Sequence, residues 1–131
     1  MTKHNYKERL ELKLDKLFSE IVRSKWYCEK CLTQNRKLNA HHIMGRKNKS
    51  TRRDINNWIC LCVRCHVFNS KFSAHKTLNR FKAWIKKKRW EIYYDDLKLK
   101  SNQICNPNIE ELEQKVEDLK IILLECVKNW L

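Results

Sequence analysis

The stretch that decides the fold opens with Cys28-Glu29-Lys30-Cys31 and closes with Cys62-Val63-Arg64-Cys65. Each end is a Cys-x-x-Cys pair, and the chain between them is long enough to fold back and bring the two pairs together. Four thiolates arranged in this way are the ligands of a closed, tetrahedral structural Zn²⁺ site. The spacing therefore predicts one structural zinc, held by Cys28, Cys31, Cys62 and Cys65.

Polar residues of another kind lie inside and just after this loop. The chain reads Ala40-His41-His42-Ile43, then Asn57, and His66 follows the last cysteine directly. In this order, over about residues 26–75, the sequence resembles the HNH nucleases, or ββα-metal family, in its cysteine-bearing branch of phage and mobile-element type. A lone Cys-x-x-Cys or a lone histidine pair is weak evidence, whereas the ordered set is specific.

The resemblance implies a role for each of these residues. His41 and His66 match the family's ligands for a catalytic divalent ion, commonly Mg²⁺ or Mn²⁺. His42 matches the general base, and Asn57 the asparagine that braces the loop presenting that base. Members of the family hydrolyse phosphodiester bonds of DNA.

The residue types suit that chemistry on independent grounds. Histidine titrates near neutrality and so can deprotonate water, while further imidazoles can hold a Lewis-acidic metal with open positions. Adjacent residues of a strand point to opposite faces, so His41 and His42 are expected to do different jobs. Ser70 stands where some members carry a second helical histidine, and His75 lies further along. We therefore expect two protein ligands for the catalytic ion, with His75 on the surface.

Charge points to the partner. The 131 residues carry a net charge of +14, and residues 26–80 hold most of the excess. A charge of this size favours a polyanion such as double-stranded DNA. The loop from Gly45 to Arg53 has no acid, and we expect it to contact DNA phosphates, although solvated loops are often charged too. Its cations are Arg46, Lys47, Lys49, Arg52 and Arg53.

Hydrophobic spacing predicts an α+β fold in which helices flank a small ββα-metal core stapled by the zinc. We expect residues 1–25 to form an N-terminal helix, 26–80 the core and 81–131 a helical extension. The expected elements are a helix over 5–24, strands over 37–43 and 58–61, a helix from 66 toward 74, helices over 77–89 and 90–100, and a last helix from Pro107.

The last helix has apolar residues spaced by three and four, as in a coiled coil. Pairing with the N-terminal helix of the same chain avoids the entropy of association, so we expect a monomer, although a homodimer through the last helix stays open. Cys126 and Trp130 occupy core positions of this pattern.

Seven cysteines are an odd number, four of them have zinc spacing, and residues 1–10 are too charged for a signal peptide. A reducing cytoplasm is therefore the expected location. No apolar run approaches transmembrane length, so no membrane partner is expected.

The sequence as a whole predicts a divalent-metal-dependent DNA endonuclease that nicks duplex DNA. A zinc-stapled nucleic-acid-binding module without catalysis is the alternative, but it gives no reason for His41, His42, Asn57 and His66 to occur together. A zinc ribbon that binds proteins is a third reading, which leaves the excess positive charge unexplained.

Overall fold

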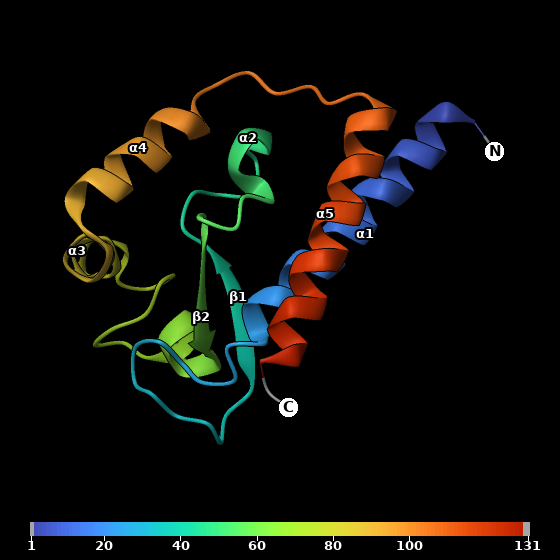
Figure 1. Cartoon of the computed structure of the whole chain (residues 1–131). Helices are drawn as coiled ribbons and strands as arrows, with labels where there is room; N and C mark the ends of the chain where they lie inside the picture. Colours follow the sequence, from blue (N-terminus) through green and yellow to red (C-terminus); the bar gives the residue numbers. More distant parts are fainter. Residues whose placement is uncertain (1, 130–131) are drawn as a thin grey trace.

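Helices and one small antiparallel sheet make up the fold, which the computed structural model describes for residues 2–129 (Figure 1). This is the predicted α+β class. The elements are α1 (Lys3–Arg23), β1 (Leu38–His42), α2 (Lys49–Arg52), β2 (Trp58–Cys62), the short π-helix η1 (Arg64–Phe68), α3 (Leu78–Arg89), α4 (Glu91–Ser101) and α5 (Ile109–Lys128). Within these residues, no helix has the length and apolar character needed to cross a membrane.

The sheet consists of β1 and β2, paired antiparallel so that His41 lies opposite Ile59 and His42 opposite Trp58. Residues 59–62 of β2 are fully buried, as expected for an apolar strand inside a small core. The predicted strands are confirmed to within a residue. Their connection is the predicted cationic loop, and it contains the single turn α2.

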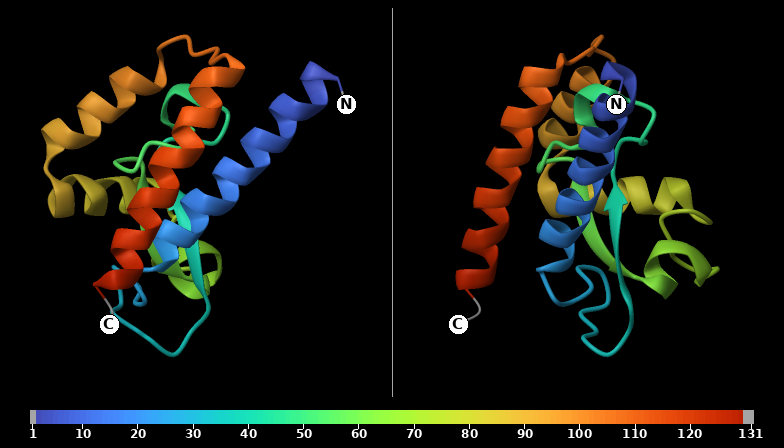
Figure 2. Two further views of the ribbon diagram at one scale, coloured as in Figure 1. Left: turned by 45° about the vertical axis from the view of Figure 1, so that its right-hand side comes forward. Right: turned by 90° about the vertical axis from the view of Figure 1, so that its right-hand side faces the viewer.

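Helices α1 and α5 lie side by side along one side of the sheet (Figures 1 and 2). Their contact is a cluster of buried aliphatic side chains: Leu10, Leu14, Ile21, Leu112, Val116 and Leu119. The predicted pairing of the first and last helices within one chain is therefore confirmed. Cys126 packs against this cluster from its edge, and Trp130 lies outside the described residues.

Helix α1 also packs against the sheet with its other buried side chains. Phe18 and Val22 form a second cluster with Cys60 of β2. On the far side of the sheet, a larger core joins β2 to α3 and α4 through Ile59, Leu61, Phe81, Ile85 and Leu97, among others. The sheet that carries the paired histidines is thus held from both sides.

The helix predicted from residue 66 toward 74 is wrong in its extent, since only η1 forms. Asn69 ends it, because its side-chain oxygen accepts a hydrogen bond from the backbone N–H of Lys71 (2.9 Å) and closes a local turn in place of a helical bond. The chain then returns, and the N–H of His75 donates to the carbonyl of His66 (3.1 Å). This return brings residue 75 beside residue 66.

Candidate functional site

The four predicted zinc ligands meet at one point. Their Sγ atoms all lie within 4.8 Å of one another, and those of Cys31 and Cys62 are 3.7 Å apart. Four sulfurs at about 2.3 Å from a tetrahedral zinc are about 3.8 Å apart, so the cluster has the size that the ion requires. Leu32 adopts a left-handed φ of 64°, which turns the chain sharply after Cys31.

The four thiols influence one another's protonation. Burial raises the pKa of the Cys62 thiol, but hydrogen bonds from the backbone of Cys65 and Arg64 and from neighbouring thiols outweigh it and bring the value to about 7. Burial and the three neighbouring cysteines raise the pKa of Cys65. Crowded thiolates repel one another, and a divalent ion at their centre removes that repulsion.

Glu29, inside the first Cys-x-x-Cys pair, anchors the cluster to the fold. Its buried carboxylate accepts hydrogen bonds from the N–H of Cys60 (2.8 Å) and from Nη2 of Arg89 (3.3 Å). A buried carboxylate is stable only when it is paired in this way. Glu29 therefore ties the first pair of cysteines to β2 and α3, a role that its place in the sequence does not indicate.

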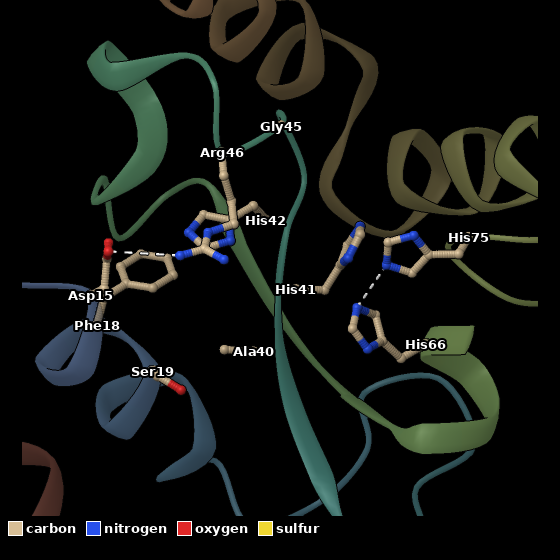
Figure 3. A pocket seen from close by; sticks show the side chains of 10 residues that line it. All are labelled: Asp15, Phe18, Ser19, Ala40, His41, His42, Gly45, Arg46, His66 and His75. Carbon is tan, nitrogen blue, oxygen red and sulfur yellow. Dashed lines mark hydrogen bonds and ion pairs between the residues drawn. The ribbon is translucent and has the colours of Figure 1, made fainter. Parts of the chain in front are cut away.

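His41 and His42 leave β1 on opposite faces, as the alternation of a strand predicts. Figure 3 shows His41 pointing toward His66 and His75, whereas His42 points toward Phe18 of α1. The division between the two neighbouring side chains is therefore a geometric fact. Each face of β1 builds a different half of the site.

Three imidazoles gather on the first face. One ring nitrogen from each of His41, His66 and His75 lies within 4.8 Å of the others, and the Nε2 atoms of His66 and His75 are 3.0 Å apart. Two imidazoles bound to one ion at about 2.1 Å place their nitrogens about 3.0–3.4 Å apart, so the spacing suits a shared cation. The side-chain amide nitrogen of Asn39 lies 3.2 Å from Nδ1 of His66 and holds the ring with its Nε2 toward His75.

His75 is the main correction to the predicted site. The side chain is exposed, as expected, but the prediction that it lies too far along the chain to reach the site is wrong. Burial, followed by the nearby histidines, lowers the pKa of His41 to about 3, and burial and His75 lower that of His66 to about 4. These two rings are neutral at pH 7, the form in which imidazole binds metals.

On the second face, the ring of His42 stacks on Phe18 at 4.8 Å between centroids and an interplanar angle of 11°. Burial lowers its pKa, and a hydrogen bond with the backbone of Arg52 opposes that shift in part. Its Nε2 is buried and has no hydrogen-bond partner among the described residues. Nε2 is therefore free to accept a proton.

Asn57 holds the backbone that follows His42. It is fully buried, and its amide nitrogen donates to the carbonyls of Met44 (3.0 Å) and Thr51 (2.9 Å). Its amide oxygen accepts from the N–H of Met44 (2.6 Å). Three hydrogen bonds from one buried side chain fix both ends of the loop, which is the bracing that the resemblance implies for this position.

One pocket of about 470 Å³ joins the two faces. It is lined by the residues labelled in Figure 3, among them all four histidines named above and, from outside the predicted set, Asp15 and Phe18 of α1. The three-imidazole cluster and the ring of His42 therefore line the same cavity. Arg46 lines the rim and can neutralise phosphate charge.

Two cations of the loop that was predicted to contact DNA, Arg52 and Arg53, are engaged within the protein. Asp15 accepts a bidentate pair from Arg52 (2.6 and 3.1 Å) and a hydrogen bond from Arg53 (3.1 Å). Arg53 is buried and also donates to the carbonyl of Glu11 (3.1 Å), so it has no open face for DNA and serves to dock α1 on the loop.

The other predicted contacts are more open. Arg46 is 63% exposed and lies 3.7 Å from Asp15, and Lys49 is 47% exposed and lies 3.6 Å from Glu11. Lys47 is exposed and has no ion-pair partner among residues 2–129. DNA contact by these three residues stays a prediction.

A comparison with known protein families matches the segment that contains these residues. The family model described as HNH endonuclease matches residues 27–72, which include the four cysteines, His41, His42, Asn57 and His66. No curated protein and no solved structure matched the chain. The matched segment ends before His75 and begins after Asp15 and Phe18, so part of the pocket lies outside it.

Proposed function

From the HNH domain that the chain carries at residues 27–72, we propose that it is a divalent-metal-dependent endonuclease that nicks duplex DNA. One observation carries the proposal. A single pocket contains three clustered imidazoles and, across β1, a fourth imidazole whose buried Nε2 has no partner among the described residues. A metal site beside an unengaged base is the arrangement that metal-assisted hydrolysis needs.

The cluster suits a divalent ion held by His41, His66 and His75. Such an ion acts as a Lewis acid on the phosphate oxygens and stabilises the leaving oxygen. Imidazole nitrogens suit transition metals, whereas Mg²⁺ prefers oxygen ligands and keeps its waters. Of the two ions that the resemblance implies, we therefore propose Mn²⁺ rather than Mg²⁺, and Zn²⁺ as the structural ion at the four cysteines.

The protein groups divide the remaining work. His42 is neutral at pH 7 because burial lowers its pKa, and its Nε2 has no hydrogen-bond partner among the described residues. Nε2 then takes a proton from the attacking water. Stacking on Phe18 fixes the plane of the ring, and the hydrogen bonds of Asn57 fix the backbone on which it stands.

The alternative is a zinc-stapled module that binds nucleic acid without cleaving it. It accounts for the four cysteines and for the positive charge. It does not account for the buried Nε2 of His42, which has no partner among the described residues. An unpaired buried polar atom lowers the stability of the fold, so such an atom is usually found where a function requires it. We therefore favour the nuclease.

The test is the conversion of supercoiled plasmid to open circle by zinc-loaded protein with Mn²⁺. We expect His42→Ala to slow nicking about 10²–10⁴-fold, the usual contribution of a general base, while zinc content and DNA affinity stay unchanged. The matched control is His4→Ala, because His4 is exposed on α1 and lies outside the pocket. Equal nicking rates for His42→Ala and the control would exclude His42 as the base.

A further inference from the structure

Helix α3 has an unusual charge composition for a solvated helix. Its sequence, Leu78 to Arg89, contains six Lys or Arg residues and no Asp or Glu. Exposed helices usually mix the two signs, because like charges three or four residues apart destabilise the helix. Such a helix is stabilised by an external partner that carries negative charge.

The cations of α3 are also left unneutralised by the protein. Lys86 pairs with Glu91 and Arg89 with Glu29, but the other four have no carboxylate partner within residues 2–129. These four, which we call the α3 ridge, are Arg80, Lys82, Lys87 and Lys88. The cationic loop shows the reverse, since Asp15 and Glu11 of α1 lie against four of its five cations.

Two residues of the ridge, Arg80 and Lys87, face away from the core, whereas Lys82 and Lys88 lie on the flanks of the helix beside the rings of Tyr94 and Trp84. Phe81 and Ile85 are the buried residues of α3, and Arg80 and Lys87, seven positions apart, lie two turns from each other on the opposite face. Between them is Ala83, exposed and small, which lets another backbone approach the helix closely. The polar contacts made by Arg80, Lys82 and Lys88 are with a carbonyl, an aromatic ring, or both, so they leave each positive charge uncompensated.

The position of α3 links this surface to the pocket. The ring of Phe81, in its first turn, packs edge-on against His41 at 4.9 Å between centroids. The helix lies on the opposite side of the sheet from the α1–α5 pair (Figures 1 and 2). A helix of twelve residues is about 18 Å long, which is the axial length of about five base pairs.

We propose that the α3 ridge is the main surface on which this protein holds the phosphate backbone of duplex DNA, from the scissile phosphate outward for about five base pairs. The inference rests on the proposed function, since it takes DNA as the substrate. It differs from the sequence prediction, which placed the phosphate contacts on the cationic loop. We favour the ridge over the loop because its positive charges complement DNA phosphates and have no carboxylate partner within residues 2–129.

The experiment measures how DNA affinity depends on salt. All proteins carry His42→Ala, so that the probe, a labelled duplex of about 30 base pairs and mixed sequence, is not cut during titration. In the ridge variant, Arg80, Lys82, Lys87 and Lys88 are changed to Gln. The matched control changes Lys3, Arg9, Lys13 and Lys16 of α1 to Gln, because these residues are exposed, have no carboxylate partner among the described residues, and remove the same net charge.

We expect the ridge variant to lower the slope of log affinity against log salt by about 3–4, since each phosphate contact contributes about 0.9. The control should change the slope by less than about 1. Circular dichroism and zinc content should match the parent in both variants. An unchanged slope in the ridge variant, or an equal drop in the control, would overturn the proposal.

The plasmid nicking assay, run on the same two variants with His42 restored, separates this inference from the proposed function. If the parent does not nick plasmid but the ridge variant still loses its salt slope, the nuclease proposal fails and the ridge stands. If the parent nicks plasmid and the slopes are equal, the nuclease stands and the ridge fails. A folded parent with no DNA affinity would overturn both.

Discussion

Replacing Asp15 by its near-isosteric amide should lower the stability of the fold with almost no change in side-chain shape. It is 18% exposed and receives the guanidinium groups of Arg52 and Arg53 at 2.6–3.1 Å. Replacing Asp15 by Asn keeps the volume and one acceptor oxygen but removes the charge. Arg53, only 8% exposed, is then left buried without its counter-ion.

The cost follows from these exposures. Breaking a fully buried ion pair costs about 3–5 kcal/mol, and an exposed pair is worth about 0–1 kcal/mol. The Asp15 pairs lie between these limits, and we expect a loss of about 2 kcal/mol. Unfolding entropy of about 2.1 cal/mol/K per residue converts this into a fall in Tm of about 7 °C for a chain of 131 residues.

The assay is thermal unfolding followed by circular dichroism, with zinc in constant excess so that metal loss does not differ between proteins. Glu11→Gln is the matched control, because its pair with the exposed Lys49 spans 3.6 Å and should be worth less than about 0.5 kcal/mol. If Asp15→Asn melts within about 1 °C of the control, then Asp15 does not hold the loop, and Arg52 returns to the set of candidate DNA contacts.

Three further outcomes are expected. His75→Gln should weaken binding of Mn²⁺, measured by calorimetry on zinc-loaded protein, at least about tenfold relative to His4→Gln, because outer-shell changes alone reach that size; unchanged affinity would limit the site to His41 and His66. Cys62→Ser should unfold the domain and release zinc, whereas Cys105→Ser, at an exposed cysteine outside the cluster, should do neither; a folded, zinc-free Cys62→Ser protein would contradict the staple. Plasmid should pass through open circle before any linear form, and light scattering at micromolar protein should give a monomer mass, since α1 already buries Leu112, Val116 and Leu119 of α5; a dimer mass with direct linearisation would refute this.

The elements of the fold were predictable where each residue's neighbours in sequence decide its structure. Alternation in β1 places His41 and His42 on opposite faces, and apolar spacing in the first and last helices predicts that they pair. The clustering of the four cysteines was predictable because a tetrahedral metal site allows only a few arrangements of its ligands. In each case a local rule operates on a short pattern.

The errors arise where two distant segments decide the outcome together. His75 reaches the pocket because the chain turns back at Asn69 and pairs its backbone with that of His66. A return of this kind has no periodicity, so the eight residues between the two histidines give no signal. An Asn-Ser pair soon after a histidine is the one local hint that the helix stops early.

The net charge of the loop is a poor guide to its DNA contacts for a similar reason. Counting the cations of the loop shows how many there are, but only the docking of α1 shows which are already neutralised by Asp15 and Glu11. Glu11 and Asp15 are four residues apart and therefore share a face of the helix, which is the pattern that indicates acidic partners for a basic loop. The same reasoning, applied to α3, finds cations without partners.

The placement of His42, the proposed general base, depends on residues far outside the segment that matches the HNH family model. Phe18 fixes the ring of His42, and Phe18 is placed by α1, which lies before residues 27–72. Helix α1 is in turn held by the aliphatic cluster it shares with α5, about seventy residues after the base. Without α5, the buried leucines of α1 face water, and the free energy that docks α1 on the sheet falls by the burial of those side chains. The zinc cluster draws no ligand from either helix. A chain shortened before α5 should therefore lose the placement of His42, the proposed base, before it loses the cluster of four cysteines proposed to bind zinc.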